Sequence, residues 1–265
     1  MSIRRIVSLI DELPAKRVLL LCHHNADPDA VCAAYAFSGL LRRLRPSLTV
    51  EAAAAQGPSR LSKTILEKIP LKLTAQPSIE DADLIVLLDT NTLQQLGEWS
   101  EPVKASHSPI IVIDHHASHP ETERLATLYV SYEEASSTCE IVYGFFKEMG
   151  VELTETEAQA VFLGLAFDTR HFVLAKSGTF KAVAELVDAG VKAQEALSLL
   201  SLPMDSPERV ARLKACQRVK LRKVHEWLMA FSHVSAYQAS AARALIGSGA
   251  HVAVVAGRRG GVLQV

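Results

Sequence analysis

Three segments of this 265-residue chain concentrate aspartate and histidine, the side chains that most often bind divalent cations: His23–Asp29, Asp89 and Asp114–His116. None of them contains a cysteine. A set of carboxylate oxygens and imidazole nitrogens favours hard or borderline ions, Mn²⁺ above all, or Mg²⁺ with more bound water. Several carboxylates brought together would repel one another unless a cation neutralised them. These residue types therefore predict a metal site.

The number of carboxylates is sufficient for two ions. Two ions about 3.5–4 Å apart activate a bridging water or hydroxide and stabilise the attacking and leaving oxygens of a phosphoryl hydrolysis. A carboxylate shared by both ions would lie near the centre of such a site. Asp89 stands alone after its apolar run, so it is the predicted shared residue.

Each of these segments directly follows a short apolar run, Val18–Cys22, Leu84–Leu88 or Ile110–Ile113. Short apolar strands that alternate with helices are typical of a parallel sheet covered on both faces. The carboxyl ends of parallel strands lie along one edge of the sheet, where ligands bind. We therefore expect an α/β fold, with a parallel sheet of the five-stranded type flanked by helices and the metal residues at its carboxyl edge.

Helical patterns follow these strands through most of the chain. The predicted helices are Asp29–Leu44, Ser137–Met149, Glu155–Asp168, Gly178–Ala189 and Ala193–Leu200. Gly150 and Gly190 lie where C-terminal glycine caps are expected. These elements predict a first domain over residues 1–200.

Ser201–Pro207, with two prolines, is the clearest linker in the sequence. We expect a long basic helix over Glu208–Val224, so that residues 201–224 form a linker and a helix. Residues 225–265 then predict a small second α/β unit with these elements: strands Trp227–His233, His251–Ala256 and Gly261–Val265, and helix Ala236–Ile246. The last strand begins at the end of the sequence without a following partner, so we expect this second unit to be truncated.

The net charge of −1 hides an uneven distribution. Residues 205–265 carry ten Lys and Arg against three Asp and Glu, a net charge of +7, and the remaining residues carry 18 against 26, a net charge of −8. Such asymmetry is typical of a chain with a surface for an anionic ligand, although a solvated basic helix would give the same count.

Composition excludes several classes of protein. With 49% hydrophobic and 22% charged residues the chain is of ordinary globular composition, and no apolar run approaches the roughly 20 residues of a membrane helix. The four cysteines form no CxxC pair, which disfavours a zinc ribbon or a disulfide framework. We expect a soluble protein of the cytoplasm without membrane partners.

Four motifs in this order resemble those of the DHH phosphoesterase superfamily: His23–Ala30, Asp89-Thr90, Asp114–His116 and Leu163–Thr169. The resemblance covers residues 17–190. Within the superfamily the chain is most similar to the small oligoribonuclease (nanoRNase) and 3′-phosphoadenosine-5′-phosphate (pAp) phosphatase branch, on the segments Ala135–Glu140 and Asp168–Phe172. The basic end of the chain resembles the start of the DHH-associated domain that holds substrate, without its glycine-rich GGGH-like segment.

The resemblance implies a ligand set for two divalent cations, Mn²⁺ first, with Mg²⁺ or Co²⁺ as alternatives. One ion would be held by His23, Asp27 and Asp89. The other would be held by four residues: Asp29, Asp89, His115 and Asp168.

Other residues receive roles from the same resemblance. His116 would face the scissile phosphate, as an electrostatic stabiliser or proton donor, and would be catalytic together with Asp89 and His115. The remaining residues would lie behind the ligands or near the substrate: His24, Asn25, Asp114, Arg170 and His171. Of these, Asp114 would orient an imidazole.

The implied activity is metal-dependent hydrolysis of short RNA or DNA oligonucleotides, of small nucleotides such as pAp, or of both. Three alternatives remain open from the sequence: a RecJ-type single-strand exonuclease, a manganese inorganic pyrophosphatase, and a non-catalytic protein that binds a linear or cyclic dinucleotide. A homodimer is also left open.

Overall fold

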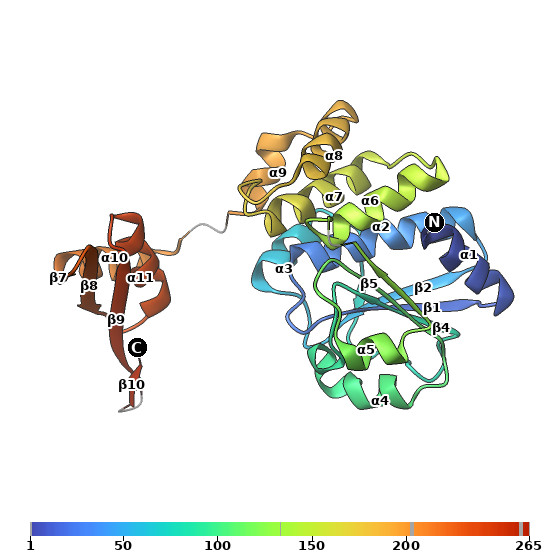
Figure 1. Cartoon of the computed structure of the whole chain (residues 1–265), viewed down its shortest axis with the longest axis horizontal. Coiled ribbons are helices and arrows are strands. Elements are labelled where there is room, and N and C mark those ends of the chain that lie inside the picture. The colour runs from blue at the N-terminus through green and yellow to red at the C-terminus, as the bar shows by residue number, and fades with distance from the viewer. Residues whose placement is uncertain (1, 133, 202–203, 260–261, 265) are drawn as a thin grey trace. The chain divides into compact units, whose positions relative to one another are not determined.

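The computed structural model describes residues 2–132, 134–201, 204–259 and 262–264. The chain forms two compact units, Met1–Ser201 and Leu202–Val265 (Figure 1). Each unit is described by itself below.

The first unit is built on a parallel sheet whose strand order is β3-β2-β1-β4-β5-β6. The strands are β1 (Arg17–Cys22), β2 (Thr49–Ala54), β3 (Leu73–Thr74), β4 (Leu84–Leu88), β5 (Ile110–Asp114) and β6 (Leu128–Ser131). The α/β prediction and the three predicted strands are confirmed, but the sheet has six strands instead of five. The edge strands β3 and β6, and β2 beside β3, lack the continuous apolar runs of the central strands, so the sequence pattern does not mark them.

Helices cover both faces of this sheet (Figure 1). The helical elements of the first unit are α1 (Ser2–Glu12), α2 (Pro28–Leu44), α3 (Arg60–Leu66), the 3₁₀ helix η1 (Leu93–Trp99), α4 (Ser100–Ala105), α5 (Pro120–Leu125), α6 (Thr138–Met149), α7 (Glu155–Asp168), α8 (Ser177–Asp188) and α9 (Ala193–Leu199). The five predicted helices correspond to α2, α6, α7, α8 and α9.

The two faces of β1 show why the strand is continuously apolar. Leu20 packs into the larger core with α1, α2, α6 and α7, whereas Leu19 and Leu21 face a smaller core with η1 and α4. A strand buried on both faces has no polar side, as expected for a parallel sheet between two helical layers.

Strand order determines where the Asp and His segments meet. β4 lies between β1 and β5, with Leu88 beside both Cys22 and Ile113. The chain returns from β1 to β2 on one side and continues with β4 on the other, so the switch in strand order lies between β1 and β4. Ligands of open α/β sheets bind at the carboxyl ends of the strands beside such a switch.

The second unit contains α10 (Ser206–Gln217), β7 (Lys220–Val224), β8 (Trp227–His233), α11 (Gln238–Gly247), β9 (Val252–Arg259) and β10 (Val262–Gln264). Its sheet has the order β10-β9-β8-β7. Of the predicted last strand, Val262–Gln264 is present as β10, and Gly261 and Val265 lie outside the described residues.

The prediction of a helix over Glu208–Val224 is wrong in its second half. The helix ends at Gln217, and Lys220–Val224 pairs antiparallel with Trp227–His233. In Lys-Leu-Arg-Lys-Val, helix propensity is overridden by pairing with the neighbouring strand, since intrinsic propensity is a weak preference that tertiary contacts outweigh.

Candidate metal centre

The loop after β1 ends in the N-terminus of α2. Asp27 is the N-cap, and its Oδ1 accepts hydrogen bonds from the backbone N–H groups of Asp29 (3.0 Å) and Ala30 (3.2 Å). Pro28 occupies the first turn, where its missing N–H costs nothing. This local structure holds the Asp27 carboxylate beside the carboxyl edge of the sheet and buries Asp29 in the first turn.

Asp29 is fully buried at the junction of three helices. Its carboxylate accepts backbone N–H bonds from Thr138 (2.6 Å) and Cys139 (3.0 Å) at the start of α6. Gly164 of α7 permits this approach, because a Cβ there would lie 2.6 Å from Asp29 Oδ1. Burial, and then the charges of neighbouring aspartates, hold the Asp29 pKa well above its ordinary value.

Asp89 lies at the centre of the site and is 2% exposed. Its Oδ2 is 3.7 Å from His23 Nε2, and its Oδ1 is 3.6 Å from His115 Nε2. Thr138 Oγ1 donates a hydrogen bond of 3.0 Å to the same Oδ1. The backbone φ of Asp89 is 53°, in the left-handed region that non-glycine residues occupy mostly at functional sites and turns. Burial raises the pKa of this carboxyl group.

His23 presents Nε2 to two carboxylates. Its Nδ1 is hydrogen-bonded to the His24 carbonyl oxygen (2.8 Å), and its Nε2 lies 3.8 Å from Asp27 Oδ2 as well as 3.7 Å from Asp89. Burial lowers the pKa of His23, but Asp27 and Asp89 outweigh that effect and raise it to about 10. Such a fixed imidazole has the orientation of a metal ligand, which needs one nitrogen engaged elsewhere.

His115 and Asp168 form the opposite side of the site. His115 Nε2 lies 2.8 Å from Asp168 Oδ2, at the end of α7, but without hydrogen-bond geometry. This nitrogen is buried and has no hydrogen-bond partner, although carboxylates surround it. A buried polar atom without a partner is costly unless something else coordinates it, and a cation between these groups would do so.

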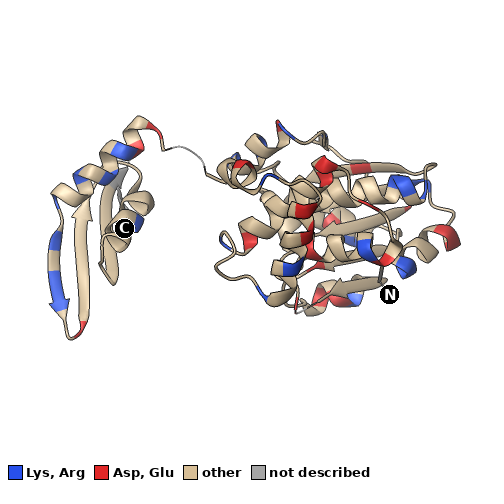
Figure 2. Ribbon diagram, turned by 90° about the horizontal axis from the view of Figure 1, so that it is seen from above, with Lys and Arg blue, Asp and Glu red and all other residues tan. Residues whose placement is uncertain are grey.

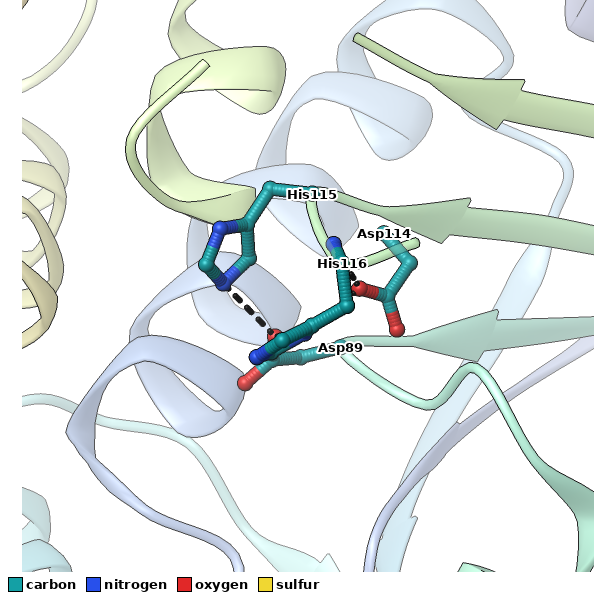
Figure 3. A group of neighbouring side chains, drawn as sticks. All are labelled: Asp89, Asp114, His115 and His116. Atoms are coloured by element: carbon teal, nitrogen blue, oxygen red, sulfur yellow. Dashed lines mark hydrogen bonds and ion pairs between the residues drawn. The ribbon is translucent and has the colours of Figure 1, made fainter. Parts of the chain in front are cut away.

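His116 and Asp114 form a pair beside the ligand cluster (Figure 3). Asp114 is fully buried, and its Oδ1 accepts hydrogen bonds from the His116 backbone N–H (2.7 Å) and from its ring Nδ1 (2.8 Å). The hydrogen bond from Asp114 raises the pKa of His116 to about 9. The His116 ring is half exposed and lines a cleft of about 450 Å³ with Tyr129 and Ser131.

All six residues predicted as ligands therefore meet at one place. Among the described residues, three groups have ligand atoms within 4.8 Å of one another: His23, Asp27 and Asp89; Asp29, His115 and Asp168; and Asp89, Asp114, His115 and His116. The two oxygens of Asp89 face two different histidines, Oδ2 facing His23 and Oδ1 facing His115. Oxygen and imidazole donors, with one orphaned buried nitrogen among them, fit divalent cations of the Mn²⁺ or Mg²⁺ type.

Four predicted residues do not join these groups. His24 is exposed, with its Nδ1 3.1 Å from the Gln95 carbonyl oxygen, and Asn25 turns the loop at a φ of 54°. Arg170 and His171 follow α7 with exposed side chains and φ values of 51° and 56°.

Thr138 was not predicted as part of the site. A capping signal was present, since Ser137 caps α6 by accepting the Glu140 N–H (3.1 Å). A capping residue indicates where a helix begins in the sequence. It does not indicate that the first residues of this helix will contact Asp29, which lies more than a hundred residues earlier in the chain.

No helix among the described residues is long and apolar enough to cross a membrane. Residues 17–165, more than half of the chain, match the model of the DHH family, N-terminal domain. The match includes five of the six predicted ligands and ends three residues before Asp168.

Two relatives illustrate how much of the chain is shared. An uncharacterized protein of Methanocaldococcus jannaschii is 33% identical over 249 residues, which are 94% of this chain and 74% of the relative. A probable manganese-dependent inorganic pyrophosphatase of Streptococcus mutans is 30% identical over 188 residues, 68% of this chain and 57% of the relative. The chain thus corresponds to little more than half the length of that pyrophosphatase.

The fold also has a counterpart among solved structures. An exopolyphosphatase-related protein from Bacteroides fragilis superposes with a TM-score of 0.73 at 20% identity, covering 88% of this chain and 70% of that one. At this identity the similarity establishes the fold.

Proposed function

The chain belongs to the DHH family, and from this membership we propose that it is a divalent-metal-dependent phosphoesterase that hydrolyses short oligonucleotides, small nucleotides such as pAp, or both. The observation that carries this proposal is that the two oxygens of Asp89 face different sides of the site, one toward His23 and the other toward His115. A carboxylate so placed could contact two cations at once, and two cations about 3.5–4 Å apart stabilise the attacking and leaving oxygens of a phosphoryl hydrolysis.

The proposal assigns His23, Asp27 and Asp89 to one ion. It assigns the second ion to the following residues: Asp29, Asp89, His115 and Asp168. Two bound ions would lower the pKa of water and neutralise charge on the phosphoryl oxygens.

The protein's own residues supply position and shape. Thr138 and the start of α6 hold Asp89 and Asp29 in place through hydrogen bonds. Asp114 occupies Nδ1 of His116, so Nε2 is the ring atom that remains to contact a phosphate in the cleft. His116 would therefore stabilise the reacting phosphate or donate a proton to the leaving oxygen.

The charge distribution favours a nucleotide chain as substrate. Residues 205–265 carry a net charge of +7, whereas the unit with the metal centre is acidic. Several cations on one unit attract a polyanion such as an oligonucleotide more strongly than a single small anion, because each phosphate can contact a different cation.

Inorganic pyrophosphate is the second candidate substrate. It is favoured by relatives named as probable manganese-dependent inorganic pyrophosphatases, which are 28–30% identical over 64–68% of this chain. Those matches cover about two thirds of this chain. They therefore support dependence on a divalent metal more than they support pyrophosphate as the substrate.

The test is hydrolysis of RNAs of two to five nucleotides, pAp and pyrophosphate with Mn²⁺. We expect turnover of the short RNAs or pAp, and a loss of about a thousandfold or more in Asp89→Asn, because the amide carries no negative charge and keeps only one of the two oxygens that would bridge the ions. Asp188→Asn, a change at an exposed residue of α8, is the matched control and should retain activity.

Each other result selects another function. Turnover of pyrophosphate alone would identify a pyrophosphatase, and a strong preference for long single strands would identify a RecJ-type exonuclease. Binding of a dinucleotide without any phosphate release, at every divalent metal tried, would refute hydrolysis and indicate a binding protein.

A further inference from the structure

The sheet of the second unit has one face that is packed and one that is open within that unit. On the packed face Ala230 of β8 is buried in a small core with Ala241 of α11, and Ser232 Oγ donates a hydrogen bond of 2.8 Å to the Ala215 carbonyl oxygen of α10. Successive strand residues point to opposite faces, so the neighbours of Ala230 in β8 point away from both helices.

Aromatic side chains lie on the open face. Trp227 is 51% exposed and Phe231 is 37% exposed. They are four residues apart on β8, on the same side, roughly 13 Å apart at about 3.3 Å per residue. Met229 lies between them on that side. An exposed patch of neighbouring apolar side chains, unlike a single exposed one, is typical of an interaction site.

Basic side chains border these rings. The register pairs Lys220 with Phe231, Arg222 with Met229 and Val224 with Trp227, and directly paired residues share a face. All residues of β7 are exposed, and Lys and Arg line this strand (Figure 2). The open face thus presents a row of cations beside a row of aromatic rings.

The other side of the row is apolar. Val252 of β9 pairs with Met229, and Val254 pairs with Phe231. Val252 is 37% exposed. Among the described side chains of β7, β8 and β9, no Asp or Glu lies on this face.

We propose that the open face formed by Lys220, Arg222, Trp227 and Phe231 binds single-stranded nucleic acid, with bases stacked on the two rings and phosphates beside the two cations. Every base has a flat π surface, so aromatic platforms bind single strands with little sequence preference. The net charge of +7 over residues 205–265 complements a phosphate chain. An apolar face that served only to pair two copies of the protein would not need the row of cations.

This face belongs to the second unit, and binding to it does not require hydrolysis. Binding of a fluorescent ten-nucleotide single-stranded RNA to the full-length chain is measured by anisotropy, with a chelator present to prevent turnover. We expect Trp227→Ala and Phe231→Ala each to weaken binding about tenfold. Trp227→Phe, which keeps a ring, should retain most of the affinity.

Salt dependence separates stacking from phosphate contacts. Lys220→Ala with Arg222→Ala should reduce the slope of log K against log[salt] by about 1.4, that is, about 0.7 for each lost single-strand phosphate contact. The aromatic variants should leave that slope unchanged. Lys214→Ala is the matched control, because Lys214 is an exposed cation on α10, in the helical layer that covers the packed face.

Three results would overturn the proposal: no RNA binding, binding that Trp227→Ala and Phe231→Ala leave unchanged, or an effect of Lys214→Ala as large as that of the β7 variants. A fall from dimer to monomer in the aromatic variants, measured by light scattering without RNA, would instead assign the face to a second copy of the chain. Hydrolysis of bis(p-nitrophenyl) phosphate by the unsubstituted protein, measured in parallel with Mn²⁺ and without chelator, reports the proposed hydrolysis independently of RNA binding, so failure of this proposal and failure of the proposed hydrolysis are distinguishable.

Discussion

Asp89 is the central residue of the site, and its environment is unusual for a carboxylate. It is buried, its backbone is in the left-handed region, and its two oxygens face two different histidines. Burying a carboxylate without a cation is costly, and burial accordingly raises its pKa. Bound cations would neutralise this carboxylate and remove the cost of burying its charge, which explains why the fold can keep an aspartate at this position.

His23 predicts a pH dependence of metal binding. Its pKa of about 10 means that the metal-free ring carries a proton at neutral pH, and a ligand imidazole must be neutral. Metal binding therefore displaces this proton, and the affinity should rise about tenfold per pH unit between pH 6 and 8. Titration calorimetry with Mn²⁺ in buffers of different ionisation enthalpy measures the released proton. An affinity that is independent of pH would contradict this assignment.

The raised pKa of His23 has the opposite consequence for the stability of the metal-free protein, which should fall as the pH rises. A histidine whose pKa is raised in the folded state contributes stability that is complete below the unfolded value, about 6.5. That contribution is lost as the pH rises toward about 10. Replacing His23 with Gln should remove this part of the pH dependence, as chemical denaturation at several pH values would show.

Thr138 predicts a positioning effect. Its hydroxyl donates to Asp89 Oδ1, so Thr138→Val leaves the side-chain volume almost unchanged but removes the donor. We expect Mn²⁺ affinity to fall about 10- to 100-fold, the usual cost of losing a group that orients a ligand. Thr138→Ser should restore the affinity. Equal affinity in the Val and Ser variants would show that the hydrogen bond does not matter.

From the sequence, the position of a side chain could be predicted where it directly follows a buried strand. His23, Asp89 and His115 can be placed because strand ends of a parallel sheet meet at one edge. Thr138 could not be found in this way, because its role depends on how α6 packs against the loop after β4. Arg170 and His171 were expected near substrate, but they follow a helix in a turn whose conformation the sequence pattern does not determine.

At the scale of elements, the site depends on how closely α7 approaches α2 and α6. A Cβ on Gly164 would lie 2.2 Å from Cys139 Sγ and 2.6 Å from Asp29 Oδ1. Cys139 lies in the first turn of α6 and Asp29 in the first turn of α2, so this one glycine lets three helices meet at a ligand. A second close contact joins two of these helices, since Arg43 of α2 binds both oxygens of the buried Glu157 of α7.

Gly164→Ala should therefore lower both stability and metal binding. Overpacking of a tight interior site costs about 1–3 kcal/mol, which corresponds to a melting temperature lower by roughly 2–10 °C for a domain of this size. Gly144→Ala is the matched control in α6, because nothing lies within 4 Å of a Cβ built there. It should raise stability by up to about 1 kcal/mol, as alanine is the better helix former. Thermal unfolding of the two variants decides, and equal behaviour would refute the packing argument.

The elements themselves were predictable in the core and less so at the edges. The helices α2, α6, α7, α8 and α9 and the three buried apolar strands were found, whereas the helix α1 was missed and β2, with its sequence Thr-Val-Glu-Ala-Ala-Ala, carries no strand signal. The second half of the expected basic helix is the strand β7. Its charged residues are exposed, so only the pairing with β8 decides its conformation.

At the scale of the whole molecule, the acidic and basic parts of the sequence coincide with the two compact units. The near-neutral total charge therefore gives no indication of the binding properties of either unit. Charge is additive along the chain, so counting residues on either side of the predicted linker is enough to show this asymmetry. The open sheet face was not predicted, since it depends on which side of β8 the two helices cover.

Mn²⁺ should stabilise the first unit through mass action. A ligand at 100 times its dissociation constant contributes about 2.7 kcal/mol, which is a rise in melting temperature of roughly 5–10 °C for a unit of this size. Scanning calorimetry should show the shift in the unsubstituted protein and in Asp188→Asn, but not in Asp89→Asn. An equal shift in all three would mean that Mn²⁺ binds elsewhere.

The central claim is that Asp89 is shared by two cations, and anomalous diffraction from crystals of the full-length chain grown with Mn²⁺ tests it most directly. The predicted result is two anomalous peaks about 3.5–4 Å apart, one within coordination distance of each Asp89 carboxylate oxygen. A single peak, or two peaks that do not touch Asp89, would contradict the claim.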